Sequence, residues 1–330
     1  MAADCKKRRS YLFGISFIIF SCILTFAQTD LNEVHVQPRY LANAANPSTS
    51  LRSEVIHKNV DLVLVPVTIT DDVNRLVTGL EKNNFELLES KKPQEIKHFS
   101  SEDSPMSIGI ILDSSASMAV KMERAREAVT QFCKTANPQD EFFLITFSDV
   151  PSLSNDFTSD MQDIQNHLLY TNPKGRTSLL DAIYLGMTKM REATQPRKAL
   201  LIISDGGDNR SRYTEKEIES SIKESDVMIY AIGLYDRNFQ TEEERRGPVL
   251  LADLAEVTGG RAYTIDNPND LPRVAERIGK ELRTQYMIGY RPQDIAHDGK
   301  WHKIKVILKV PKQFSFLRVH ARTGYYAPKE

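Results

Sequence analysis

Between residues 105 and 283 the sequence alternates short apolar runs with stretches of helical periodicity. The runs "SIGIILD", "KALLIISDG" and "VMIYAIGLY" place apolar residues side by side, without the polar alternation of a half-buried strand. Strands of this kind are buried on both faces, as in a parallel sheet covered by helices on each side. The alternation therefore predicts an α/β fold for residues 105–283, with a doubly wound, mostly parallel sheet.

Helical patterns separate these runs. In "VKMERAREAVTQFCKTA" the apolar residues Met122, Ala125 and Val129 recur at the spacing of one helix face. Capping residues predict that the last helix of the region begins at Asn269 or Asp270.

Residues 55–104 and 284–330, on either side of this region, are rich in strand-forming residues and show no helical pattern. The first segment predicts a hairpin from Phe85 to Ser100. In the second, "HKIKVILKV" alternates lysines with Ile304 and Val306, which is typical of a half-buried strand. We expect residues 284–330 to pair with residues 55–104, so that a small β-sandwich flanks an inserted α/β domain.

The N-terminus predicts export. A basic stretch, Lys6 to Arg9, precedes an uncharged apolar stretch, Tyr11 to Ala27, that ends in small residues. This order is typical of a signal peptide over residues 1–27, and places the mature protein in the periplasm, at the cell surface or outside the cell. An uncleaved membrane anchor and a lipoprotein modified at Cys22 remain alternatives. Residues 28–54 are polar and aperiodic, as in a linker or disordered arm.

Charge and cysteine content exclude several classes of protein. The formal net charge of −1 gives no basic face for nucleic acid. Of the three cysteines, Cys5 and Cys22 lie in the predicted signal peptide, which leaves Cys133 without an intrachain disulfide partner. The seven histidines are scattered without the spacing of a zinc site.

Three clusters of oxygen-bearing side chains follow strands of the predicted sheet or open its helices. They are "DSSAS" from Asp113, "KGRTS" from Lys174 and "SDGGDN" from Ser204. Ligands of open parallel sheets bind at the carboxyl ends of the strands, so the clusters are expected to converge there. Oxygen ligands without sulfur or imidazole suit Mg²⁺, Ca²⁺ or Mn²⁺. The alternative is that the serines and threonine cap helices, and that Asp205 belongs to a turn.

The spacing of these residues matches a known family. Asp113-x-Ser115-x-Ser117 after an apolar strand, Thr177 in "GRTS" and Asp205 in "ISDG" together resemble the von Willebrand factor type A domain and its metal-ion-dependent adhesion site. The "VTGG" at 257–260 is similar to a stretch of this domain as well. The segments before residue 105 and after residue 283 resemble a bacterial subgroup of exported proteins with this domain.

The resemblance implies a Rossmann-like domain over residues 105–283 that binds Mg²⁺, with Mn²⁺ or Ca²⁺ as alternatives. Ser115, Ser117 and Thr177 would be direct metal ligands. Asp113 and Asp205 would act directly or through water. We place Asp181 and Asp208 outside this set. We expect Asp181 to be an ordinary acid in the first turn of a helix, and the alternative is that it accepts hydrogen bonds from groups around the metal ligands.

The function implied is a non-enzymatic binding module whose metal takes a carboxylate from an Asp or Glu of a partner protein. The last helix, Asp270 to Arg283, is where the resemblance places a shift coupled to ligand binding. Two alternatives are a metal-dependent hydrolase and a structural scaffold with a vestigial site. Against a hydrolase, the sequence has no G-x-S-x-G motif or P-loop, and Ser115 has no evident histidine partner.

Overall fold

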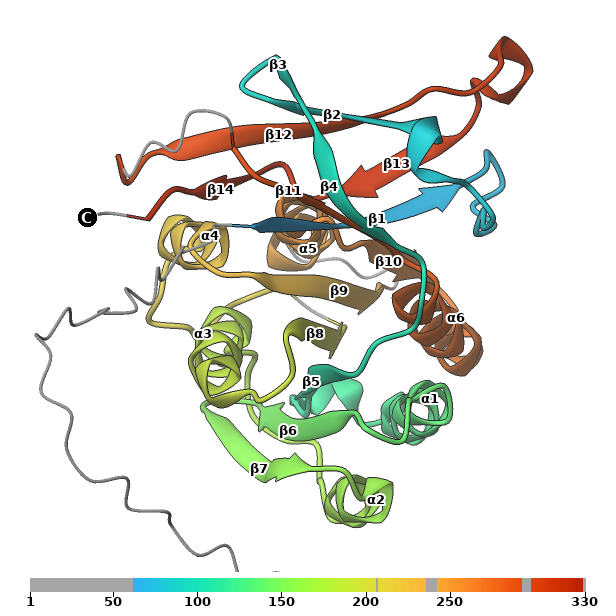
Figure 1. Cartoon of the computed structure of the whole chain (residues 1–330). Helices are drawn as coiled ribbons and strands as arrows, with labels where there is room; N and C mark the ends of the chain where they lie inside the picture. Colours follow the sequence, from blue (N-terminus) through green and yellow to red (C-terminus); the bar gives the residue numbers. More distant parts are fainter. Residues whose placement is uncertain (1–61, 206, 236–241, 293–297, 329–330) are drawn as a thin grey trace, which may run out of the picture. The chain divides into compact units, whose positions relative to one another are not determined.

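Six strands form a central sheet in the computed structural model, which describes residues 62–205, 207–235, 242–292 and 298–328 (Figure 1). Their spatial order is β10 (Ala262–Ile265), β9 (Val227–Leu234), β8 (Arg197–Ser204), β5 (Met106–Asp113), β6 (Glu141–Phe147) and β7 (Pro151–Thr158). All neighbours are parallel except β6 and β7. The central strands β5 and β9 are buried along their whole length, which explains why their sequences show no polar alternation.

Helices cover both faces of this sheet (Figure 1). On one face lie α1 (Met122–Cys133), α2 (Met161–Leu169) and α6 (Leu271–Arg283). On the other lie α3 (Leu179–Lys189), α4 (Glu215–Lys223) and α5 (Glu242–Thr258). The predicted α/β class, with a doubly wound and mostly parallel sheet, is therefore confirmed.

The edge strand β7 was not predicted. It pairs antiparallel with β6, and none of its residues is fully buried. Its sequence, "PSLSNDFT", is mostly polar because an edge strand is covered less than a central one. A pattern search based on apolar residues has little to find in such a strand.

Two antiparallel sheets of four strands flank the α/β domain. One has the order β13 (Arg318–Ala321), β1 (Val63–Thr70), β11 (Tyr286–Tyr290) and β4 (Ile96–Ser100). The other has the order β14 (Gly324–Tyr326), β12 (Trp301–Leu308), β2 (Phe85–Glu89) and β3 (Lys92–Gln94). The sheets share one apolar core, in which the rings of Phe85 and Tyr286 lie 5.1 Å apart. Strands from before and after the α/β domain are thus paired in both sheets.

The predicted hairpin from Phe85 to Ser100 is wrong in its second half. A hairpin joins β2 to β3 through Ser90 and Lys91, both at positive φ. The chain then leaves this sheet, and β4 pairs with β11 in the other one. Alternating residues mark a strand but do not say which neighbour it pairs with, so the sequence alone could not place β4.

A buried carboxylate fastens α6 to the sheet. Glu281 has no exposed surface. It accepts hydrogen bonds from the hydroxyls of Tyr230 on β9 (3.0 Å) and Tyr263 on β10 (2.7 Å). The Arg261 guanidinium lies 3.1 Å from its second oxygen and also donates to Asn74. This network joins α6, the sheet edge and the turn after β1.

The turn at 257–260 packs directly on the backbone of β9. A Cβ atom added to Gly260 would lie 1.9 Å from the carbonyl oxygen of Ile229. The same turn accepts a hydrogen bond from Thr323 N at Val257 O (3.2 Å). This turn therefore packs closely against both the α/β domain and the C-terminal strands.

A partly buried histidine makes stability depend on pH. Burial lowers the pKa of His320 to about 4, with further contributions from the charges of Arg261 and Arg318. Its Nε2 lies 3.0 Å from the Thr70 hydroxyl. The unfolded chain protonates this histidine near pH 6.5, so between the two values it binds more protons than the folded chain. The stability contributed by neutral His320 should therefore be lost as the pH falls through this window.

When the pH falls from 7 to 5, we expect protonation of His320 in the unfolded chain to lower the free energy of unfolding by about 1 kcal/mol, after allowing for the partial exposure of this side chain. His320→Gln should remove that component of the pH dependence. Urea unfolding of both proteins at the two pH values measures it. Equal losses in the parent and the variant would contradict the assignment.

The predicted signal peptide, its anchor and lipoprotein alternatives, and the arm at 28–54 all lie outside the described residues. Within the described part of the chain, no helix is long and apolar enough to cross a membrane.

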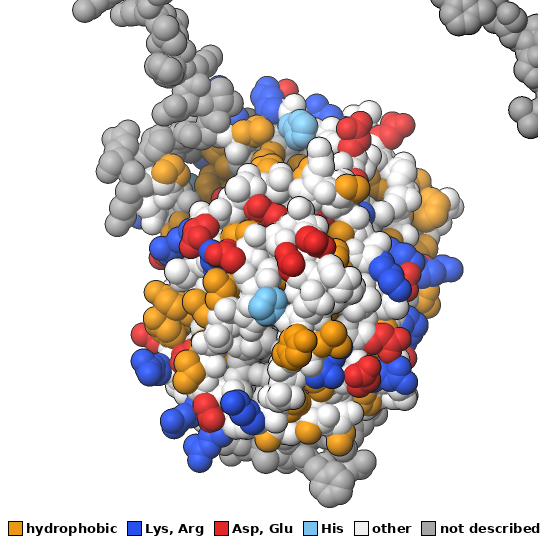
Figure 2. Space-filling view, turned by 90° about the horizontal axis from the view of Figure 1, so that it is seen from below, with side chains coloured by type: hydrophobic (Ala, Val, Ile, Leu, Met, Phe, Trp, Pro, Cys, Tyr) orange, Lys and Arg blue, Asp and Glu red, His pale blue; other side chains and the backbone are white. Residues whose placement is uncertain are grey.

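Figure 2 shows one face of the molecule, on which acidic and basic side chains are intermixed rather than gathered by sign.

Candidate functional site

Asp113 ends β5 at the carboxyl edge of the central sheet. Its side chain is fully buried. One carboxylate oxygen accepts a hydrogen bond from Ser115 N (2.8 Å) and the other from the Ser204 hydroxyl at the end of β8 (2.5 Å). Burial, followed by the nearby charge of Asp205, raises the pKa of Asp113 to about 6. In the part of the chain that the structure describes, no basic side chain pairs with it.

A chain of hydroxyls links this strand end to Asp205. The Oγ atoms of Ser115 and Ser117 lie 3.0 Å apart, and Ser117 Oγ donates to Asp205 Oδ1 (2.8 Å). Ser115 and Asp205 are buried, whereas Ser117 is exposed. Four of the five predicted site residues therefore form one connected cluster that reaches solvent at Ser117.

Thr177 approaches the cluster through its loop. Two backbone hydrogen bonds join this loop to the loop after β5. Ala116 N donates to Gly175 O (3.1 Å), and Lys174 N donates to Ser114 O (2.8 Å). Thr177 is buried, and its amide donates to Asn209 Oδ1 (3.0 Å). Its hydroxyl makes no hydrogen bond to the other four predicted residues.

The helix-cap explanation does not account for the serines. Ser115 precedes the 3₁₀ turn Ala116–Met118 without a side-chain capping bond. Ser178 precedes α3, but its hydroxyl donates to Ser148 O instead. Asp208, which we had placed outside the site, receives the hydrogen bond from Leu180 N at the start of α3 (3.3 Å). The hydroxyls of Ser115 and Ser117 are thus directed into the cluster.

Asp181 has a more specific contact than the sequence predicted. One of its carboxylate oxygens accepts hydrogen bonds from the amides of Arg212 (2.8 Å) and Tyr213 (3.2 Å). It therefore anchors the loop after β8, and the expectation of an ordinary acid in the first turn was incomplete.

Ser204 and Asn209 lie in the predicted cluster "SDGGDN", although sequence analysis did not single them out. Two further neighbours of the cluster, Lys121 and Tyr235, were missed. The Lys121 ammonium lies 2.6 Å from Asp205 Oδ2. The Tyr235 hydroxyl is buried without a partner among the described residues, and its pKa is raised by burial and by the charges of Asp205 and Asp113. Of these, only Lys121 carries a sequence signal, since it lies four residues after Ser117, about one helical turn.

One known family matches part of the chain. Residues 108–207 match the von Willebrand factor type A domain. The matched range begins within β5 and contains all five predicted site residues. A comparison with curated proteins gave no significant match.

Several solved structures are similar to the chain at low identity. A von Willebrand factor type A structure from Catenulispora acidiphila is 13% identical, with a TM-score of 0.48, over 81% of this chain and 75% of its own. An aerotolerance-related membrane protein from Bacteroides fragilis is 20% identical, with a TM-score of 0.42, over 54% and 98%. The vWF domain of the type V pili tip protein Mfa5 from Porphyromonas gingivalis is 12% identical, with a TM-score of 0.45, over 54% and 95%. Similarity at this level says nothing about the function of this chain.

The side chains of the cluster are donors that suit a hard cation. Two carboxylates and three hydroxyls supply only oxygen. In the described residues, no three His, Cys, Asp or Glu side chains gather as a metal-binding group. Mg²⁺ and Ca²⁺ accept such oxygen sets, whereas zinc sites use histidine and cysteine. The residues present therefore fit the cation that the family resemblance implies.

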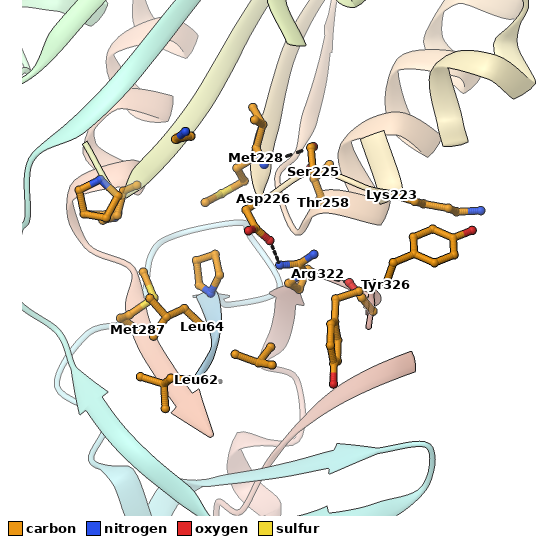
Figure 3. Close-up of a pocket in the computed structure, with 18 of the residues that line it drawn as sticks. Leu62, Leu64, Lys223, Ser225, Asp226, Met228, Thr258, Met287, Arg322 and Tyr326 are labelled. Carbon is orange, nitrogen blue, oxygen red and sulfur yellow. Dashed lines mark hydrogen bonds and ion pairs between the residues drawn. The ribbon is translucent and has the colours of Figure 1, made fainter. Parts of the chain in front are cut away.

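A pocket of about 710 Å³ lies at the opposite edge of the same sheet (Figure 3). Residues at the amino ends of β8 and β9 line it, together with strands of the flanking sheets. Leu62, Leu64 and Met287 form an apolar wall, and Asp226 and Arg322 pair with each other at 2.6 Å. These two charges satisfy one another, so the pocket does not present the oxygen set of the carboxyl edge.

Proposed function

We propose that this protein binds a divalent cation, Mg²⁺ first and Mn²⁺ or Ca²⁺ as alternatives, at Asp113, Ser115, Ser117, Thr177 and Asp205. Through the metal it would bind a carboxylate of a partner protein without catalysing a reaction. The observation that carries the proposal is the connected cluster Asp113–Ser115–Ser117–Asp205. In this cluster the Asp113 carboxylate is buried, and no basic side chain among the described residues pairs with it.

The charge of the cluster supports a metal with an external ligand. Asp113 and Asp205 balance a divalent charge, and the serine and threonine hydroxyls are neutral donors. The bound cation would supply an electrophilic coordination position, which a partner's Asp or Glu oxygen can fill in place of water. Ser117 is exposed at the rim of the cluster, so a partner's carboxylate would reach the metal from the side of Ser117.

The hydrogen bonds of Ser115 favour binding over hydrolysis. A serine nucleophile needs a general base in contact with its hydroxyl. Here the Ser115 hydroxyl is paired with the Ser117 hydroxyl. The described histidines that form hydrogen bonds through their rings, His302 and His320, bond to Glu89, Asp298 and Thr70, away from the cluster. A metal-dependent hydrolase remains the alternative that an activity panel with Mg²⁺ would reveal.

The location of the partner follows from the predicted export. We propose that the site faces the periplasm, the cell surface or the medium, where the partner protein is found. No nucleic acid partner is proposed, because the net charge is −1.

Calorimetry with Mg²⁺ and Mn²⁺ tests the metal site. We expect one cation per chain, and a loss of affinity of about a hundredfold or more in Asp113→Ala, which removes one of the two negative charges. Asp226→Ala is the matched control, since this exposed aspartate lies at the other edge of the sheet. Equal affinities in the parent and Asp113→Ala would exclude the proposed ligand set. The absence of metal binding up to about millimolar concentration would favour a vestigial site.

Capture of a partner tests the second half of the proposal. The protein is used to retain proteins from the native envelope fraction in Mg²⁺ and in chelator. We expect a retained protein that chelator releases and that Asp113→Ala fails to hold. A partner bound equally well in chelator and by Asp113→Ala would show that binding does not run through a metal.

A further inference from the structure

Lys121 places a positive charge inside the candidate metal site. It follows the 3₁₀ turn Ala116–Met118 and immediately precedes α1. Its Nζ lies 2.6 Å from Asp205 Oδ2, within an ion pair in which the lysine side chain is 19% exposed and the aspartate side chain not at all. It is therefore a largely buried contact, where water screens charge poorly.

The two oxygens of Asp205 have different partners. Oδ1 accepts from the Ser117 hydroxyl, on the side of the serine cluster, and Oδ2 accepts from Lys121. Asp113, in contrast, has hydrogen bonds from neutral groups. Among the described residues, Asp205 thus has a basic partner and Asp113 does not.

We propose that Lys121 acts as an internal cation that weakens the affinity of the site for a divalent metal and leaves the loaded site with net positive charge. The inference rests on the proposed function. It adds Lys121 as a residue that sets the metal affinity and the net charge of the site.

The physical argument is electrostatic. An ammonium bonded to Asp205 Oδ2 neutralises half of the negative charge that attracts a cation, and it would repel a divalent ion held by the cluster. With Asp113 and Asp205 ionised and Lys121 protonated, a site carrying a divalent cation keeps one net positive charge. Such a site favours an anionic oxygen over water as its remaining ligand, which is the carboxylate chemistry proposed above.

Manganese titration followed by electron paramagnetic resonance tests the inference on the whole protein. We expect Lys121→Met, which keeps the apolar stem and removes the charge, to bind Mn²⁺ about tenfold more tightly or better. Lys121→Gln keeps a hydrogen-bond donor for Asp205 without the charge and should tighten binding in the same direction. Lys134→Met removes the same charge from the exposed far end of α1 and should change nothing.

The outcomes separate the two proposals. If the parent and both Lys121 variants bind no Mn²⁺, the proposed function fails and this inference fails with it. If the parent binds Mn²⁺ but both Lys121 variants bind it equally or more weakly, Lys121 is not a competing cation, and the proposed function stands. Should Lys121→Met fail to fold, Lys121→Gln decides. Should both variants be too unstable for the titration, the increase of Tm with added Mn²⁺ decides, since tighter binding must give a larger shift than in the parent.

Discussion

Glu281→Ala is expected to lower the free energy of unfolding by about 3–5 kcal/mol, because it leaves a largely buried charge, one buried hydroxyl and one partly buried hydroxyl without their partner. Glu281 is fully buried and holds Arg261, Tyr230 and Tyr263 at once. Arg261 is itself only 11% exposed in its side chain, so water cannot easily replace the lost carboxylate. Urea unfolding measures the change.

Glu276→Ala on the same helix is the matched control. Glu276 pairs with Lys280 across the exposed side of α6, and such pairs contribute about 0.5 kcal/mol or less. A loss below about 1 kcal/mol for Glu281→Ala, or equal losses in the two variants, would show that the Glu281 network does not hold α6 to the sheet.

Gly260→Ala is expected to destabilise the protein by about 3 kcal/mol or more, at the upper end of what overpacking costs. The added methyl group would meet the carbonyl oxygen of Ile229 at 1.9 Å and its carbon at 2.7 Å. A side chain could rotate away from such a clash, but the backbone of the central strand β9 cannot. Either β9 or the turn at 257–260 would have to move, which would disturb the contact between the α/β domain and the C-terminal strands.

Gly79→Ala separates this effect from backbone strain. Gly79 has a φ of 82° and open space around its Cβ position, so alanine there should cost only about 1 kcal/mol through its left-handed conformation. Thermal unfolding of both variants gives the comparison. If Gly260→Ala loses no more stability than Gly79→Ala, the close approach to Ile229 is not limiting.

The fold class could be predicted because burial on both faces leaves a plain signature. Strands such as β5 and β9 contain almost only apolar residues, and β12 alternates because only one of its faces is covered. The edge strand β7 and the partner of β4 could not be predicted. The first has too few buried residues to give a pattern, and the second depends on a pairing between residues far apart in the chain.

The candidate site shows the same division. Asp113, Ser115 and Ser117 follow one strand at fixed spacing, so the sequence alone indicates that they lie together. The contact of Lys121 with Asp205 joins residues 84 positions apart, and that of Ser204 with Asp113 joins residues 91 apart. Neither lysine nor serine is unusual at a helix start or a strand end. Their roles emerge only when the fold brings the strands β5 and β8 side by side.

The pairing of β4 with β11 also determines how the chain would carry tension. These antiparallel strands immediately precede and follow the α/β domain, with Ser100 opposite Met287. Both ends of the inserted domain therefore leave through neighbouring strands of one flanking sheet. A force pulling on the two ends of the flanking sheets would act first on the hydrogen bonds between their strands. The loops at the carboxyl edge of the central sheet would come under this load only after that sheet had ruptured.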